Sequence, residues 1–118
     1  MTYVTVALRA LKNSQPPYEA EFLVDTGASD SLASGSALRE AGTEPVGRMS
    51  YELADGSIKE YPFGLAVIEF FGEITAGRVI FGPDDVEPVL GATALESVGI
   101  LIDPTSKTLK RLPAIPLK

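Results

Sequence analysis

The segment at residues 20–27 constrains the fold most strongly, because an apolar strand there ends abruptly in an aspartate, a hydroxyl residue and a glycine. Alternate residues of 20–24 are apolar, which is typical of a half-buried strand, so Asp25 lies where the chain leaves the core for a loop. Gly27 permits the positive φ of a tight turn, and the Thr26 hydroxyl can hydrogen-bond across to a neighbouring loop. Asp-Thr-Gly alone fits an ordinary Asx-type turn better than an active site, so its surroundings must decide.

The first half of the chain otherwise reads as short elements separated by turn residues. Residues 2–10 alternate as a half-buried strand does, and the Asn, Ser and Pro residues of 13–17 predict a turn. A short strand is predicted at 31–33. A brief helix is predicted next, with Ser36 as its cap and Gly42 as its stop.

Two hairpins are predicted in the second half of the chain. The first joins strands at 49–53 and 58–61 through Ala54-Asp55-Gly56-Ser57. Asp-Gly between two strands is a strong signal of a type I′ turn, because that turn needs positive φ values. The second hairpin joins 64–72 to 74–81, and its nearly continuous apolar character predicts burial on both faces.

Two separate motifs resemble one protein family. Phe22-Leu23-Val24-Asp25-Thr26-Gly27-Ala28-Ser29 resembles the active-site motif of the retropepsin-like aspartic proteases, single-domain relatives of retroviral protease that also occur in cellular genomes. The family's second element, two apolar residues and a glycine before a short helix, is matched by Val89-Leu90-Gly91 and residues 92–98. Residues 100–104 are similar to the strand and turn of cellular members. Two ordered elements at the right separation are stronger than either alone.

The resemblance, which spans roughly residues 3–112, implies a fold and a set of roles. The fold is expected to be all-β, a closed acid-protease (retropepsin-like) β-barrel with one or two short helices, forming a single domain over residues 1–118. Asp25 is expected to be the catalytic residue of an aspartic endopeptidase, in a loop supported by Thr26-Gly27-Ala28. The turn at 54–57 corresponds to the flap that closes over a bound peptide, although the residues alone fit a purely structural hairpin equally well.

A single Asp-Thr-Gly motif has a consequence for assembly. Aspartic proteases use two carboxylates that share one proton, so two subunits must each donate Asp25 across a two-fold axis. The active species is therefore expected to be a homodimer acting on peptide or protein substrates, with Thr26 bonding across the axis. Two alternatives stay open: a noncatalytic peptide-binding or dimerisation module on the same fold, and a processing protease specialised for one cellular protein. The Asp25 carboxylate favours catalysis, because a module that only binds does not need it.

Three features depart from the family pattern. Retroviral members pair an Asp shortly after the first motif with an Arg after the second glycine, but Ser29 and Ala92 occupy these positions here. Pro113 and Pro116 suit an edge or an irregular tail better than interleaved terminal strands. Ala28 cannot hydrogen-bond the catalytic carboxylate as the hydroxyl of pepsin-like enzymes does, which predicts activity peaking at about pH 4 to 6.

Composition excludes several kinds of chemistry. The chain has no cysteine and no histidine, so disulfides, thiolate or histidine zinc sites and Ser-His or Cys-His triads are excluded. The net charge of -6 opposes nucleic-acid binding. No cofactor or metal is expected, because Asp84 and Asp85 are more typical of a solvent-facing turn than of a calcium site. No signal-peptide pattern or transmembrane run is present, so we expect a cytoplasmic protein without a membrane partner.

Overall fold

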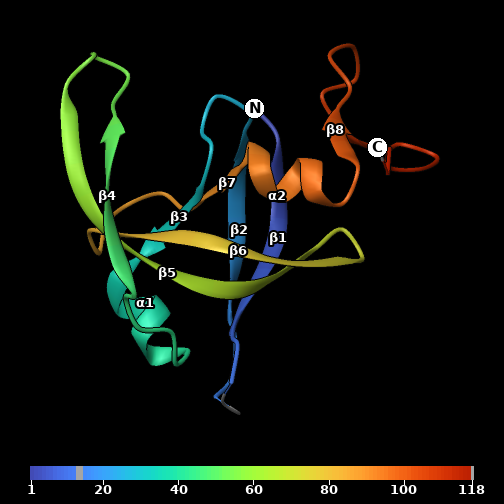
Figure 1. Ribbon diagram of the computed structural model, residues 1–118. Coiled ribbons are helices and arrows are strands. Elements are labelled where there is room, and N and C mark those ends of the chain that lie inside the picture. The colour runs from blue at the N-terminus through green and yellow to red at the C-terminus, as the bar shows by residue number, and fades with distance from the viewer. Residues whose placement is uncertain (13–14, 118) are drawn as a thin grey trace.

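The computed structural model describes residues 1–12 and 15–117, so Asn13 and Ser14 of the predicted turn lie outside the described residues. Over these ranges the chain forms nine strands and two short helices (Figure 1). The strands are β1 (Tyr3–Ala10), β2 (Tyr18–Asp25), β3 (Ser31–Ser34), β4 (Gly47–Glu52), β5 (Ile58–Phe70), β6 (Glu73–Gly82), β7 (Val89–Gly91), β8 (Ile100–Ile102) and β9 (Leu109–Arg111). The helices are α1 (Gly35–Glu40) and α2 (Ala92–Ser97).

Six of the strands close into a barrel. Their order is β1-β2-β7-β3-β6-β5, and β5 pairs with β1 to complete the ring. The β2–β7 and β3–β6 pairs are parallel, and the other pairs in the ring are antiparallel. β4 pairs with β5 outside the ring, while β8 and β9 form a separate two-stranded sheet. The predicted all-β closed barrel with two short helices is therefore confirmed.

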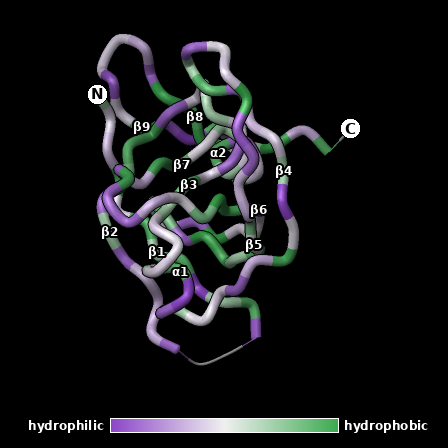
Figure 2. Tube along the Cα trace, turned by 90° about the vertical axis from the view of Figure 1, so that its left-hand side faces the viewer, coloured by the Kyte–Doolittle hydropathy of each residue, from purple (hydrophilic) through white to green (hydrophobic). Residues whose placement is uncertain are grey.

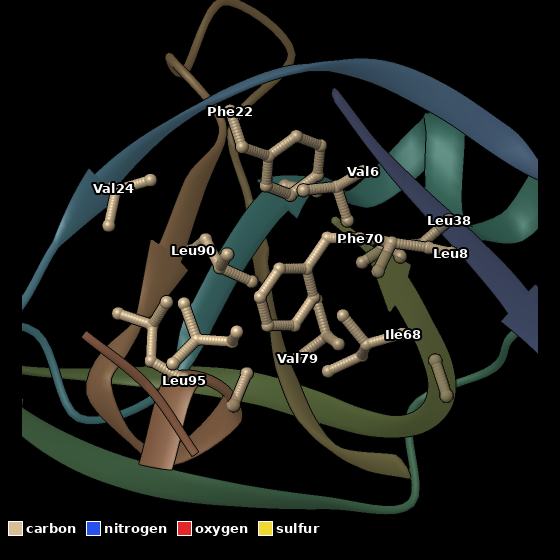
Figure 3. Close-up of a cluster of buried hydrophobic side chains, with 14 of the residues drawn as sticks. Val6, Leu8, Phe22, Val24, Leu38, Ile68, Phe70, Val79, Leu90 and Leu95 are labelled. Atoms are coloured by element: carbon tan, nitrogen blue, oxygen red, sulfur yellow. The ribbon is translucent and has the colours of Figure 1, made fainter. Parts of the chain in front are cut away.

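The core lies inside the barrel, because alternate residues of each strand point toward its axis. In β2, Phe22 and Val24 are buried while Glu21 is exposed, as the sequence alternation predicts. Hydrophobic stretches gather where β5, β6 and β7 cross the middle of the molecule (Figure 2). Figure 3 shows the side chains that converge from five strands and both helices: Val6, Leu8, Phe22, Val24, Leu38, Ile68, Phe70, Val79, Leu90 and Leu95.

The turn type of the first hairpin differs from the prediction. In the β4–β5 turn only Gly56 has a positive φ, at 86°, and its N–H donates to the carbonyl oxygen of Leu53 at 2.9 Å. That arrangement is typical of a three-residue hairpin loop ending in a left-handed glycine, so the predicted type I′ turn is wrong. Two consecutive positive φ values, as type I′ requires, occur instead at Phe71 (52°) and Gly72 (77°), which join β5 to β6.

The strand β5 also differs from the prediction, because it runs unbroken through Pro62. β6 pairs with β5 only from Phe63 onward, so Pro62 lies where one edge of the strand is unpaired and a missing N–H is tolerated. The predicted burial of both faces of the β5–β6 hairpin is wrong as well. Leu65 and Ile74 are 44% and 64% exposed, because an antiparallel sheet of this kind packs one face on the core and leaves the other to solvent.

The helix α1 has a different cap from the predicted one. Ser34 caps it, with its Oγ accepting a hydrogen bond from the Ala37 N–H at 3.3 Å. Ser36 lies inside the first turn and donates to Asp84 Oδ1 at 2.6 Å. Gly42 follows the helix with a φ of 94°, so the predicted glycine stop is confirmed.

The elements that carry the candidate site lie at one end of the barrel. The tip of the β4–β5 hairpin, α2 and β8 all lie at this end, and α1 lies at the opposite end (Figure 1). Residues 112–117 form no regular element, as the two prolines predict. Within the described residues, none of the helices has the length and apolar character that crossing a membrane requires.

Candidate active site

Asp25 is the last residue of β2, and its backbone pairs with Gly91 of β7. Its side chain is exposed, and Oδ1 accepts a hydrogen bond from the Gly27 N–H at 2.9 Å. Its carbonyl oxygen accepts one from the Ala28 N–H at 3.1 Å, which closes a turn. We call residues 25–30 the Asp25 loop. Gly27 does not have the positive φ suggested by the sequence. A Cβ there would lie 3.2 Å from Asp25 Oδ1, so glycine instead leaves the carboxylate unobstructed.

The helix α2 braces the Asp25 loop through backbone atoms. The N–H groups of Ala92 and Thr93 donate to the carbonyl oxygens of Ala28 and Ser29 at 2.7 and 3.1 Å. The cap residue of α2, Gly91, has no side chain that could satisfy these donors, so the loop supplies the acceptors that a helix start requires. Backbone bonds therefore hold the loop at the positions where the retroviral Asp–Arg pair is missing.

The strand β7 approaches the Asp25 loop more closely than a side chain would allow. A Cβ on Gly91 would lie 2.6 Å from the carbonyl oxygen of Asp30 and 2.8 Å from that of Ser29. The Gly91 N–H donates to Oγ of Ser31 at 3.1 Å, and Ser31 is 2% exposed. Leu90, fully buried, anchors β7 in the core. The sequence reasoning missed Ser31, whose only signal is a hydroxyl residue two positions after the motif.

A cavity of about 650 Å³ lies between the Asp25 loop and the β4–β5 hairpin. The loop contributes residues 27–30, and the hairpin contributes residues 49–53 and Tyr61. The predicted flap turn, Ala54-Asp55-Gly56-Ser57, is exposed and lies beyond this lining. The part of the hairpin that faces the loop is therefore β4, which the sequence predicted as a strand but without a functional role. The remaining lining residues are Leu32, Arg78, Ile80, Pro83 and Val86.

The turn at 54–57 is organised around an acidic side chain. Asp55 Oδ1 accepts hydrogen bonds from the N–H and the hydroxyl of Ser57, at 2.9 and 2.6 Å. These bonds favour the charged carboxylate and hold the pKa of Asp55 below its ordinary value. The next residue, Ile58, is apolar and 72% exposed. The tip of the hairpin therefore carries both a charged and an apolar side chain at the surface.

Three polar side chains from separate elements meet in the cavity wall. The Tyr51 hydroxyl donates to Asp30 Oδ2 at 2.7 Å, linking β4 to the Asp25 loop. Nη1 of Arg78, on β6, lies 3.8 Å from the same oxygen, and the guanidinium lies over the ring of Phe63 at 4.5 Å. The sequence reasoning missed all three residues. Its one available signal was Arg78 itself, a charge in the apolar run at 74–81.

The environment of Tyr51 fixes its protonation state. Burial is the main cause that raises its pKa, and the hydrogen bond to Asp30 and the Asp30 charge add to it, giving about 12. The nearby positive charge of Arg78 acts in the opposite direction. The phenol therefore stays a neutral donor to Asp30 across the pH range in which proteins work.

Thr26 lies apart from this cavity. It is exposed and lines a second cavity of about 430 Å³, whose other walls come from α2, β8 and Pro104. Leu95, Ile100 and Ile102 are among the apolar residues there. Thr26 is thus adjacent to the helix that follows the second motif, and it is exposed on the surface of the chain.

The acidic residues after β6 lie at the surface. Asp84 and Asp85 are exposed in the loop, and Asp84 accepts the hydrogen bond from Ser36. Among residues 1–12 and 15–117 there is no group of three or more acidic side chains that could hold a metal ion.

This architecture is similar to that of a known viral protease. The solution structure of the simian foamy virus (mac) protease superposes on the chain with a TM-score of 0.56 and 14% sequence identity, covering 80% of this chain and 91% of that one. No family model matches the chain, and neither does any curated protein. At this identity the likeness is one of fold. The closed six-stranded barrel with two short helices is therefore a retropepsin-like fold.

Proposed function

We propose that residues 1–118 form one protease domain, and that two copies of it assemble into an aspartic endopeptidase. The observation that carries this proposal is the position of Asp25. Its exposed carboxylate ends β2 and accepts a hydrogen bond from Gly27, the first loop residue that lines a cavity large enough for peptide side chains, in a loop braced by β7 and α2. The chain has a single Asp-Thr-Gly motif, so the second carboxylate must come from a second copy.

The reaction needs two Asp25 carboxylates a few ångströms apart, which share one proton because both cannot ionise in so small a space. The charged carboxylate takes a proton from a water molecule as that water attacks the peptide carbonyl carbon. The protonated carboxyl donates to the carbonyl oxygen as it becomes an alcohol oxygen. The proton taken from the water then passes from its carboxyl to the leaving amine as the C–N bond breaks, and the other carboxylate takes a hydroxyl proton as the carbonyl re-forms, which restores the shared proton. The titration belongs to the pair and not to either Asp25 alone.

Neighbouring residues would support this chemistry in distinct ways. The Gly27 N–H already holds Asp25 Oδ1 and would orient the carboxylate. Thr26, exposed on the outside of the subunit, is suited to bond across the two-fold axis. Ala28 offers no competing hydroxyl near the dyad. The turn at 54–57 would act as the flap over a bound peptide, with the β4 residues of the hairpin forming the roof of the cavity.

Replacing the proposed catalytic carboxylate tests the function. We expect wild-type protein to cleave a diverse peptide library at acidic pH, and Asp25→Asn to lose at least about a thousandfold in rate while remaining dimeric by sedimentation. Asp85→Asn, which changes an exposed acid in the loop after β6, is the matched control and should retain full activity. Equal behaviour of wild type and Asp25→Asn would instead favour the noncatalytic binding or dimerisation module.

A further inference from the structure

The cavity next to the Asp25 loop contains an arginine with no tightly bonded carboxylate. Three other arginines, Arg9, Arg48 and Arg111, each donate from Nε to a glutamate at 2.7, 2.7 and 3.0 Å. Arg78 lacks such a bond, as does Arg39, whose Nε lies 3.7 Å from Glu44 Oε1. The nearest carboxylate oxygen to Arg78 among the described residues is Asp30 Oδ2 at 3.8 Å, beyond hydrogen-bond distance. The guanidinium donates to the sulfur of Met49, a weak acceptor, and also interacts with the Tyr51 hydroxyl, which uses only part of its five N–H donors. Much of its donor capacity is therefore open to the cavity.

Asp30 has complementary capacity left. Tyr51 and Arg78 both approach Oδ2, and Oδ1 accepts no hydrogen bond from any described residue. The Asp30 side chain is 13% exposed and lines the cavity, so an occupant of the cavity can reach it. One wall of the cavity thus presents an available acceptor, Asp30 Oδ1, next to the available N–H donors of Arg78.

The charges of the wall decide which occupant fits. Asp30 and Arg78 compensate each other, and the Tyr51 phenol is neutral. The remaining acid in the lining, Glu52, is exposed at the end of β4, where solvent screens it. For a substrate carboxylate or ammonium, attraction to one charge of the pair and repulsion by the other offset each other, so neither ion recovers the hydration it loses. A carboxamide is neutral and carries both a donor and an acceptor.

We propose that the Asp30–Arg78 pair is a specificity site for a glutamine or asparagine side chain of the substrate. The amide N–H donates to Asp30 Oδ1, and the amide oxygen accepts from the Arg78 guanidinium. Tyr51 is a positioning residue, because its hydrogen bond keeps Asp30 oriented toward the cavity. This inference rests on the proposed protease function for its natural substrate, but the recognition itself requires only that a peptide enters the cavity.

Cleavage of a peptide mixture is the first test. We expect glutamine and asparagine to be enriched at one position within a few residues of the cleaved bond. In matched synthetic peptides, kcat/KM for glutamine at that position should exceed the values for glutamate, lysine and methionine by about tenfold, the effect of about 1.4 kcal/mol. Cleavage without any preference for a carboxamide would overturn the inference and leave the protease function intact.

Two substitutions should change the preference in opposite directions. Asp30→Asn leaves the Arg78 charge uncompensated, so glutamate should become the preferred residue. Arg78→Gln leaves the Asp30 charge uncompensated, so lysine should become preferred. Arg9→Gln removes an arginine on β1 that pairs with Glu69, far from the cavity lining, and should leave the glutamine preference unchanged. Circular dichroism checks that each variant is folded. If one of the two substitutions prevents folding, the change in preference caused by the other is sufficient for the test.

Binding to Asp25→Asn separates this inference from the function. Fluorescence anisotropy of the same labelled peptides should show the same glutamine preference without turnover. That preference in a wild-type protein that cleaves nothing would support the specificity site and contradict the protease. An unchanged preference in both swap variants would contradict the specificity site, and the absence of both binding and cleavage would contradict both proposals.

Discussion

Gly91 and Asp30 meet backbone to backbone: a Cβ on Gly91 would lie 2.6 Å from the Asp30 carbonyl oxygen. This contact joins two segments that lie sixty residues apart and fixes the Asp25 loop against β7. A side chain at position 91 would force the two backbones apart, and the loop would lose its hydrogen bonds to the first turn of α2. The geometry of the candidate site therefore depends on one glycine outside the first motif.

We expect Gly91→Ala to lower the free energy of unfolding by about 3 kcal/mol, because backbone atoms cannot yield as a flexible side chain can. Urea denaturation followed by circular dichroism measures this change. Gly77→Ala is the control, since its Cβ would meet only Ile68 Cδ1 at 3.9 Å, and we expect a change of less than about 1 kcal/mol. Similar losses for the two variants would show that the close contact is unimportant.

We expect Ser31→Ala to lower the free energy of unfolding by about 1 to 3 kcal/mol, because the buried Gly91 N–H would lose its acceptor. The same denaturation experiment applies. Ser106→Ala removes an exposed hydroxyl from the β8–β9 turn and should change stability by less than about 0.5 kcal/mol. Were Ser31→Ala as stable as this control, the hydroxyl would not be holding β7.

We expect Thr26→Ala to weaken dimerisation by about tenfold, because the residue is exposed and is proposed to hydrogen-bond across the two-fold axis. Sedimentation equilibrium gives the dissociation constant, and dilution should reduce the activity of the variant earlier than that of the wild type. Thr5→Ala, an exposed change on β1, should leave both properties unaltered. A dimer of undiminished affinity would place Thr26 away from the axis.

We expect activity to peak at about pH 4 to 6, because the dyad works with one shared proton and fails when both carboxyls are protonated or both are ionised. The pH dependence of kcat/KM measures this. Ala28→Ser introduces a hydroxyl that can hydrogen-bond the charged carboxylate and favour that form, which should move the optimum to more acidic pH. A wild-type maximum near pH 2 would contradict the role given to Ala28.

We expect Tyr51 to ionise at a pKa of about 12, as burial and its bond to Asp30 require. Because this value lies above the ordinary 10.0, the stabilisation from the neutral phenol is complete below about pH 10 and is lost as the pH rises toward 12. Titration of the Tyr Cζ resonances by 13C NMR measures the pKa. Asp30→Asn should lower it toward 10.0; an unchanged value would mean that Asp30 does not hold the phenol.

The sequence determined the local elements, because they depend on neighbouring residues. The alternation of β1 and β2, the glycine stop of α1 and the helix after Val89-Leu90-Gly91 were all readable from the order of residues. Resemblance to a family identified Asp25 and the barrel. The sequence was misleading about the turns. Asp55-Gly56 predicted a type I′ turn, but two consecutive positive φ values occur at Phe71-Gly72 instead.

Only the tertiary structure decided what surrounds Asp25. The parallel pairing of β2 with β7, and the contact of Gly91 with Asp30, join segments too distant in sequence for any local pattern to reveal. The cavity wall likewise takes Tyr51 from β4 and Arg78 from β6, and neither residue carries a motif. Their proximity follows from the closure of the barrel, because strand register and not sequence spacing sets which side chains meet.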